Sequence, residues 1–246
     1  NELNPSVDYT DPYNWRFGTI TLRPTIADNL DLILGRNRDN YYLNFGLGYN
    51  VVRDIFTQIR SLQPDGKTYV VWQNINDRIE YGASTWNGYT FSAKFRLNMN
   101  ASYTFNRYSM ADRLQLRYRN GGSFTSGVNA SYQPASVWNI NGGFTFNRFA
   151  SPQGFVRWNS SMNIAIQRKF FNRRLMVTAT VIDPVQQQVN RTFTYGVNFR
   201  HESYSYTQTR NYRLTLSYNF LNVGRKPTRE EEAEKDKLKQ FLPIKR

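Results

Sequence analysis

The segment from Arg96 to Arg107 reads RLNMNASYTFNR and decides the fold class. Its odd-numbered positions from 97 to 105 are all apolar, whereas the even-numbered positions from 96 to 106 carry Arg, Asn, Ser or Thr. A period of two is typical of a β-strand whose two faces meet different surroundings. The segment therefore predicts a strand with one face suited to hydrocarbon and the other, a row of amides and hydroxyls, suited to water.

The same alternation recurs along the chain. Further strands are expected at residues 43–62, 69–81, 128–132, 138–146, 158–166, 175–181 and 211–220. Turn-forming residues separate them, at Pro64-Asp65-Gly66, Pro134-Ala135-Ser136 and Phe171-Asn172-Arg173. We expect about nine or ten strands in all, several of them longer than a bilayer requires.

The amino-acid composition distinguishes a membrane β-barrel from a helical membrane protein and from a soluble β-sandwich. The chain has 246 residues with 17 Tyr, 17 Phe and 5 Trp, and no stretch approaches the roughly 20 apolar residues of a membrane-spanning helix. A strand that crosses a membrane needs only about 10 alternating residues. A soluble β-sandwich also alternates, but its strands disfavour the Asn that fills the polar positions here. The sequence therefore predicts an all-β, antiparallel transmembrane β-barrel.

Two strands supply the residues expected to contact lipid. The predicted lipid-facing residues are Leu97, Met99, Tyr103, Phe105, Leu214, Leu216 and Tyr218. Aromatic residues gather at strand ends, where membrane interfaces recruit them, as in the pair Tyr218 and Phe220.

The composition changes after Phe220. Thr228 and Glu231 form a capping box, and apolar residues follow before Pro243, so a short helix is expected. We therefore divide the chain into barrel strands at 1–220 and a charged, partly helical tail at 221–246, expected in the periplasm. The tail is interpreted either as a solvated helix or as a docking element for a periplasmic or lipoprotein partner.

The net charge of +14 allows several partners: nucleic acid, an anionic membrane surface or lipopolysaccharide. Basic residues cluster with an aromatic at Arg113, Arg117, Tyr118 and Arg119, and around a hairpin at Arg157, Arg168, Lys169, Arg173 and Arg174. In a barrel, Arg173 and Arg174 would belong to a periplasmic turn, and Arg113, Arg117 and Arg119 would face the lumen or the outer loops. We therefore expect contact with lipopolysaccharide or an anionic solute and no nucleic-acid binding.

The sequence predicts no catalytic, cofactor or metal site. The chain has no cysteine, and its one histidine, His201, is expected in a loop or at a strand end beside Glu202 and Ser203. Adjacent strand residues point to opposite faces, so these three cannot form a catalytic triad. Asp28, Asp31 and Asp39 are expected in a solvated outer loop. We expect no enzyme activity, no cofactor and no metal site.

Several motifs resemble a known family. The stretches Arg168–Pro184 and Leu214–Phe220, with Trp72-Gln73-Asn74-Ile75-Asn76 and Asn98–Tyr103 upstream, resemble the end of TonB-dependent receptor barrels of the Bacteroidota outer-membrane β-barrel family. Leu3-Asn4-Pro5-Ser6-Val7 is a weaker match to an Asn-Pro segment of the same family. The resemblance implies a plug domain, a TonB box and about 22 strands in the whole protein. Neither plug nor TonB box is visible here, so we expect this chain to be part of a longer one.

The resemblance implies a function in the bacterial outer membrane. We expect the C-terminal part of a TonB-dependent receptor that imports a ligand, coupled to the TonB system through a plug outside this chain. The alternative is a stand-alone structural or assembly barrel, one subunit of an outer-membrane complex. Outer-membrane lipid, lipopolysaccharide and the barrel-assembly machinery are expected partners in either case, and the sequence does not identify the imported ligand. The resemblance also implies that Tyr218 and Phe220 are the signal that the barrel-assembly machinery reads.

Overall fold

The computed structural model describes residues 3, 6–109, 119–185, 189–206 and 209–220, which form strands and connecting segments without a helix. Fourteen strands occur in these residues. They are β1 (Asn14–Phe17), β2 (Ile26–Arg38), β3 (Tyr41–Arg53), β4 (Ile55–Leu62), β5 (Thr68–Ile75), β6 (Arg78–Ser92), β7 (Phe95–Tyr108), β8 (Gly121–Tyr132), β9 (Trp138–Ser151), β10 (Gly154–Phe170), β11 (Leu175–Ile182), β12 (Val189–Tyr195), β13 (Arg200–Tyr206) and β14 (Asn211–Tyr218). The predicted tail at 221–246 and the basic cluster at 113–118 lie outside the described residues.

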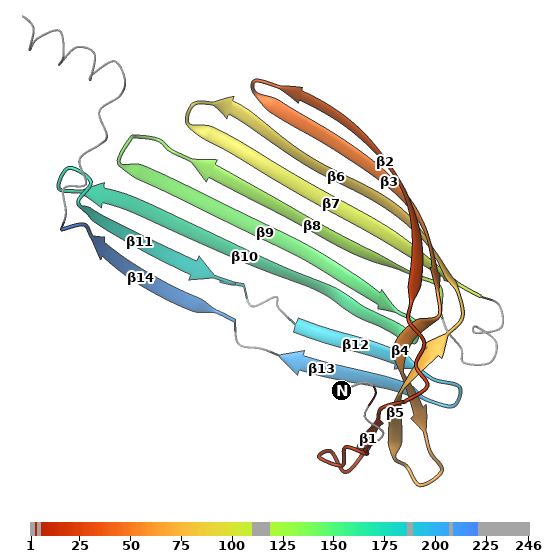
Figure 1. The fold of residues 1–246 in the computed structure, drawn as a ribbon. Helices are drawn as coiled ribbons and strands as arrows, with labels where there is room; N and C mark the ends of the chain where they lie inside the picture. Colours follow the sequence, from red (N-terminus) through yellow and green to blue (C-terminus); the bar gives the residue numbers. More distant parts are fainter. Residues whose placement is uncertain (1–2, 4–5, 110–118, 186–188, 207–208, 221–246) are drawn as a thin grey trace, which may run out of the picture.

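The large sheet contains 11 strands, all paired antiparallel (Figure 1). The long strand β10 pairs with β9 on one side, and on the other with β12 at one end and β11 at the other. Because β13 pairs with β12 and β14 with β11, two pairs of strands lie end to end, and the 11 strands fill nine positions across the sheet (11 minus two). Within the described residues β2 forms one edge and β13 with β14 the other.

Strand register gives the sheet one apolar face. Residues that pair across strands share a face, and Leu97 on β7 begins a row that crosses the sheet to Tyr212 on β14. The row is Leu97, Ala130, Gly142, Ile164, Val181 and Tyr212. Since side chains alternate along each strand, all seven predicted lipid-facing residues lie on this side, which we call the apolar face. That it contacts lipid stays a prediction.

The opposite side, the polar face, carries the amides that the sequence places between the apolar residues. Asn98 pairs with Asn129, which pairs with Gly143, and the side chain of Asn163 lies against that glycine. A Cβ at Gly143 would lie 2.3 Å from Oδ1 of Asn163, so a larger residue there would displace the amide. The polar face is therefore a close-fitting layer of hydrophilic side chains.

The two ends of the large sheet differ. At one end, the turn end, short turns at residues 39–40, 93–94, 133–137 and 171–174 join neighbouring strands, and β14 finishes there. The expected hairpins around 134–136 and 171–173 are confirmed. At the other end, the cap end, β3 leads away from the sheet into a separate three-stranded sheet before β6 returns.

This three-stranded sheet, the cap, corrects two predictions. The stretches expected as single strands at 43–62 and 69–81 are each broken, between β3 and β4 at Asp54 and between β5 and β6 at residues 76–77. The β4–β5 hairpin turns at Pro64-Asp65-Gly66 as expected, where Gly66 has a φ of 84°. β1 pairs in parallel with β5 and completes the cap.

One loop prediction was also wrong, because Asp28 and Asp31 lie within β2, although Asp39 lies in the β2–β3 turn. His201 is the second residue of β13, which agrees with the expected strand end. The sequences of β2 and β13 are polar or irregular when each is taken alone. Their extended conformation depends on pairing with β3 and β12, respectively. Pairing with a neighbour therefore overrides weak local strand preference here.

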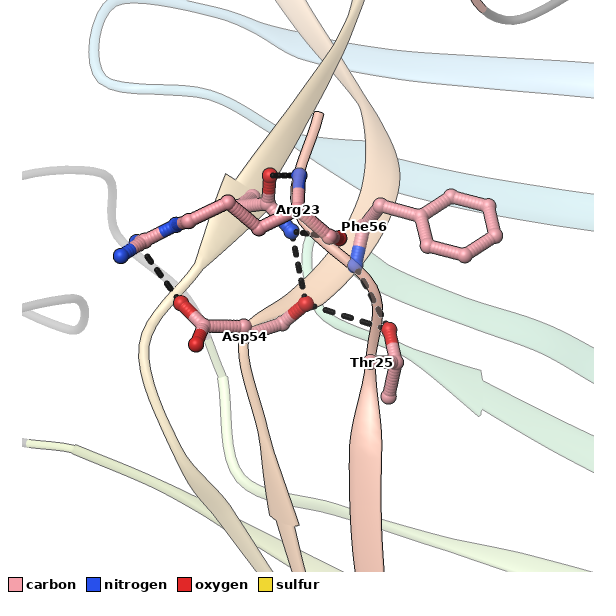
Figure 2. Close-up of polar contacts among 5 residues, drawn as sticks. Arg23, Thr25, Asp54 and Phe56 are labelled. Atoms are coloured by element: carbon pink, nitrogen blue, oxygen red, sulfur yellow. Dashed lines mark hydrogen bonds and ion pairs between the residues drawn. The ribbon is translucent and has the colours of Figure 1, made fainter. Parts of the chain in front are cut away.

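The bend at Asp54 is held by hydrogen bonds from the segment that precedes β2 (Figure 2). Asp54 has a φ of 50°, and its carbonyl accepts hydrogen bonds from Thr25 Oγ1 at 3.1 Å and from the side-chain amide of Asn74 at 2.7 Å. Its carboxylate lies 2.7 Å from the Arg23 guanidinium. Thr25 Oγ1 also accepts a hydrogen bond from the Phe56 amide at 3.3 Å. We call these residues the hinge clamp.

The hinge clamp predicts a ranking of substitutions at Asp54. Asp54→Asn tolerates the left-handed backbone and loses only an exposed ion pair, so it should lower the free energy of unfolding by less than about 1 kcal/mol. Asp54→Val introduces a β-branched residue at positive φ and should cost about 2 kcal/mol. Urea unfolding of the full protein in detergent measures the difference. Equal losses for both variants would contradict the role of the backbone conformation.

The face assignment predicts opposite outcomes for two adjacent positions on β7. Met99 lies on the apolar face and Asn100 on the polar face, and both side chains are exposed in this chain. Met99→Arg should cost about 2–4 kcal/mol in a membrane, because it places a charge in hydrocarbon, whereas Asn100→Arg should cost much less. Folding yield into lipid vesicles measures both, and equal costs would refute the assigned register.

Candidate functional site: the cap over the polar face

The cap rests on the polar face through the chain's main cluster of buried apolar residues. Ile55, Ile59 and Ile75 of the β4–β5 hairpin form this cluster with Val52 of β3 and Tyr108 of β7. Val52 and Tyr108 occupy polar-face positions, because they share alternation with Asn50 and Asn106. The hairpin therefore folds over the polar face, and the described core lies at the rim of the sheet rather than along its strands.

Two side-chain amides pin the far end of the cap to other parts of the sheet. Gln153, in the β9–β10 turn, accepts a hydrogen bond from the Arg60 amide at 2.8 Å and donates one to the Arg60 carbonyl at 3.0 Å. Asn198, in the β12–β13 turn, donates to the Leu62 carbonyl at 3.4 Å. The cap thus reaches from its attachment at β3 and β6 to the ends of β10 and β12 (Figure 1). It covers part of the polar face at this end.

Charged side chains lie beneath the cap on the polar face. Arg78 forms an ion pair with Glu80, and Asn50 donates a hydrogen bond to Glu80 Oε2 at 3.3 Å. The Arg78 and Glu80 side chains are only 21% and 17% exposed. The opposite charges of Arg78 and Glu80 neutralise each other, which avoids the large free-energy cost of leaving one charge unpaired away from water. The surface beneath the cap can therefore be electrically neutral at this point.

The outer part of the cap carries an aromatic cluster. Trp15 stacks on Tyr69 with ring centroids 5.7 Å apart, and Tyr9 meets Trp15 edge-on at 4.9 Å. The Lys67 ammonium lies 3.7 Å from the Trp15 ring. Burial lowers the pKa of the nearby Arg60 guanidinium. This surface can offer stacking and cationic contacts to a ligand that approaches the cap.

Aromatic residues line both ends of the apolar face. At the turn end, neighbouring ring centroids lie 4.4–6.3 Å apart in a continuous series. Its members are Tyr41, Tyr89, Phe91, Phe95 and Tyr132. At the cap end, ring pairs are separated by 4.7–6.2 Å. Those pairs join Tyr49 to Tyr81, Phe146 to Phe124 and Trp158, and Phe155 to Phe193. Two aromatic girdles with an apolar band between them are typical of an outer-membrane barrel.

The structure gathers some predicted site residues and separates others. Leu97, Met99, Tyr103 and Phe105 lie on β7, whereas Leu214, Leu216 and Tyr218 lie on the edge strand β14. Phe220 follows β14 with its ring centroid 4.7 Å from that of Tyr218. Whether this pair is an assembly signal stays a prediction.

The basic group around the second hairpin is not a single cluster. Arg157 lies at the cap end of β10 and Arg168 at its turn end. Sequence reasoning also missed Gln153, because nothing in its local pattern indicates a partner 93 residues away.

Two further points concern a metal-ion site and a membrane-spanning helix. No three His, Asp or Glu side chains among them come together to hold a metal ion. Within the described part of the chain, no helix is long and apolar enough to cross a membrane.

Two solved receptor structures resemble this fold. The siderophore receptor PirA from Pseudomonas aeruginosa superposes with a TM-score of 0.56 at 12% identity, over 84% of this chain and 32% of that one. The siderophore receptor PirA from Acinetobacter baumannii gives a TM-score of 0.55 at 16% identity, over 84% and 33%. The chain thus spans about a third of the length of these receptors. At this identity the likeness concerns the fold alone.

The sequence itself identifies the family. No curated protein matches the chain. The profile of the outer membrane protein beta-barrel family, however, matches residues 1–218, which include all fourteen described strands. The alternating faces and the two aromatic girdles agree with that match. The chain therefore belongs to the outer membrane protein beta-barrel family of the bacterial outer membrane.

Proposed function

We propose that this chain is the C-terminal part of a TonB-dependent receptor that imports a ligand across the outer membrane. The observation that carries the proposal is the cap, which folds over the polar face and is pinned to the β9–β10 and β12–β13 turns. A pore that admits solutes freely gains nothing from such a fixed obstruction, whereas a receptor needs a shaped mouth that holds its ligand. The fold likeness to two siderophore receptors supports the same function.

The remaining strands of the barrel would come from outside this chain. The edges at β2 and at β13 with β14 have no partner strand among the described residues, and an open edge in lipid leaves backbone groups without hydrogen bonds. A barrel of about 22 strands, closed by further strands around a plug, would satisfy both edges. In this proposal the plug, outside this chain, couples the barrel to TonB, and the protein carries out transport without catalysing a reaction.

The proposed orientation places the cap outside the cell and the turn end in the periplasm. Outer-membrane barrels have short periplasmic turns and longer outer loops, which matches the difference between the two ends. The tail at 221–246 would then begin in the periplasm, where a periplasmic or lipoprotein partner could meet it. Barrel-assembly machinery would read Tyr218 and Phe220 from that side.

Cysteine labelling tests this orientation, and the chain has no cysteine of its own. Asp65→Cys lies in the β4–β5 turn of the cap, and Ser136→Cys lies in the β8–β9 turn at the turn end. A membrane-impermeant maleimide should label Asp65→Cys on intact cells and Ser136→Cys only after the outer membrane is permeabilised. The reverse pattern would show the opposite orientation.

Cross-linking of the complete protein to TonB tests the function. Formaldehyde treatment of living cells should join the full-length protein to TonB, with a yield that increases when ligand-containing medium is supplied. Mass spectrometry of the same sample gives the length of the chain, and a shift on boiling in a detergent gel shows that it is a folded barrel. A folded barrel of about this size that never joins TonB, and instead purifies with other outer-membrane proteins, would favour the assembly subunit.

A further inference from the structure

An unexpected group of arginines lies on the apolar face at the cap end. Arg148 of β9, Arg157 of β10, Arg191 of β12 and Arg200 of β13 line one cavity of about 380 Å³. The aromatic residues Phe155, Trp158 and Phe193 complete its lining. We call this cavity the arginine pocket. Its lining residues come from β9, β10, β12 and β13, which lie next to one another in Figure 1 except that β9 is separated from β12 by β10.

Strand register places the pocket on the apolar face rather than in the lumen. Arg148 pairs with Phe124, which pairs with the predicted lipid-facing residue Tyr103. Phe155 pairs with Ala150, two positions from Arg148, and also with Phe193. Arg191 and Arg200 share alternation with Phe193 and its neighbour Tyr195 along β12 and β13. The guanidinium groups therefore project from the side that faces the membrane.

Two local irregularities build the pocket. The register of β10 against β9 shifts between Val156 and Asn159, so that Arg157 and Trp158 both reach the same cavity although they are adjacent. A β-bulge is the standard way to aim two neighbouring side chains to one side. At Gly154, a Cβ would lie 1.8 Å from the Phe193 carbonyl oxygen, so only glycine allows β12 to approach β10 this closely.

The height of the pocket corresponds to a membrane interface. Arg148 lies ten positions from Trp138 on β9 (148 minus 138), and Trp138 stacks with Arg168 at the turn end, 4.8 Å from its ring. Ten residues span about 33 Å along a strand and about 25 Å along the barrel axis at a tilt of about 40°. The apolar band of an outer-membrane barrel is about 25 Å tall. The arginine pocket therefore lies at the opposite interface from Trp138, the outer one in the proposed orientation.

The charge of the pocket is not balanced by its own residues. None of the lining residues is acidic, and Glu202 is ion-paired with Arg191. The guanidinium groups lie over aromatic rings, with Arg148 5.1 Å from Phe155 and 5.4 Å from Trp158, and Arg191 5.2 Å from Phe193. Stacking orients the planar guanidinium group of Arg148 for bidentate contact with phosphate, whereas Arg191 also donates from Nε to Glu202.

We propose that the arginine pocket binds the phosphate groups of lipopolysaccharide in the outer leaflet, with the neighbouring aromatic rings against the acyl chains. The anion that a membrane presents at this height is a lipid headgroup, and four arginines against one carboxylate leave a net charge of +3 (four minus one) to match it. Arg119, which stacks on Tyr195 at 3.9 Å beside Arg200, extends the cationic surface toward the rim. This inference depends on membrane insertion and on the orientation above, but not on transport.

The test measures binding of the bacterium's own lipopolysaccharide to the full-length protein in neutral detergent. The triple variant Arg148→Gln, Arg191→Gln, Arg200→Gln should bind at least tenfold more weakly, because each arginine contributes an independent contact with the headgroup. Arg168→Gln is the matched control, since Arg168 also stacks on aromatics of the apolar face but at the turn end. The Arg168→Gln variant should bind lipopolysaccharide as tightly as the unmodified protein does. Equal loss in the control and the triple variant would overturn the proposal.

Glu202→Gln gives a change in the opposite direction. It removes the carboxylate that is paired with Arg191, so lipopolysaccharide should bind a few-fold more tightly. A residue that only maintained the fold would weaken binding or leave it unchanged. Tighter binding in this variant therefore separates recognition of phosphate from a structural role.

A comparison of lipids keeps the proposal testable if the triple variant fails to fold. Lipopolysaccharide stripped of phosphate by aqueous hydrogen fluoride should bind the unmodified protein at least tenfold more weakly than the intact lipid, and added salt should reduce the difference. Equal binding of both lipids would show apolar contact alone. Complete displacement by millimolar inorganic phosphate would show a site for free phosphate. Either result overturns the assignment, whereas loss of TonB cross-linking with retained lipid binding would affect the proposed transport function only.

Discussion

The structure depends on pairing every strand with its neighbours in a fixed register. In a membrane, backbone N–H and C=O groups have no water to bond with, so each must find a partner on the next strand. Register then decides the faces, because a shift of one residue would move a whole strand's apolar residues to the other side. The row from Leu97 to Tyr212 shows how consistently this holds across the large sheet. The short turns at the turn end limit such slips.

Three departures from regular pairing lie toward the cap end, close to the proposed functional features. At Asp54 the chain bends from β3 into the cap, and the bulge beside Arg157 directs two side chains into one pocket. Gly154, which has no Cβ, allows β12 to approach β10 closely. Side chains supply the hydrogen bonds that the backbone loses at such places. The Asn74 amide bonds to both backbone groups of Arg23, as Gln153 does with Arg60. Irregular backbone is stable at the rim because each exposed polar group there finds a substitute partner.

The basic character of the chain also follows from the arrangement of the sheet. Arginines on the apolar face stack on aromatic rings at its two ends, as Arg168 does on Trp138 and Arg148 does on Trp158. A charge in the middle of the apolar band would cost several kcal/mol, whereas the same charge at an interface costs little and can meet anionic headgroups. On the polar face, Arg78 is instead paired with Glu80. Arg148 and Arg168 are thus held by aromatic rings, and Arg78 by a carboxylate.

The sequence by itself determined the two-faced strands, the main hairpins and the aromatic strand ends, because alternation and turn chemistry are local properties. It did not determine the breaks at Asp54 and at residues 76–77, because an extended chain keeps its alternation when it leaves one sheet for another. β2 and β13 were missed because their strand conformation comes from pairing with β3 and β12. Only the tertiary structure brings Gln153 to Arg60, or joins arginines from four strands into one pocket. Contacts between residues far apart in sequence leave no local pattern, since each partner is an ordinary polar residue until the sheet places it beside the other.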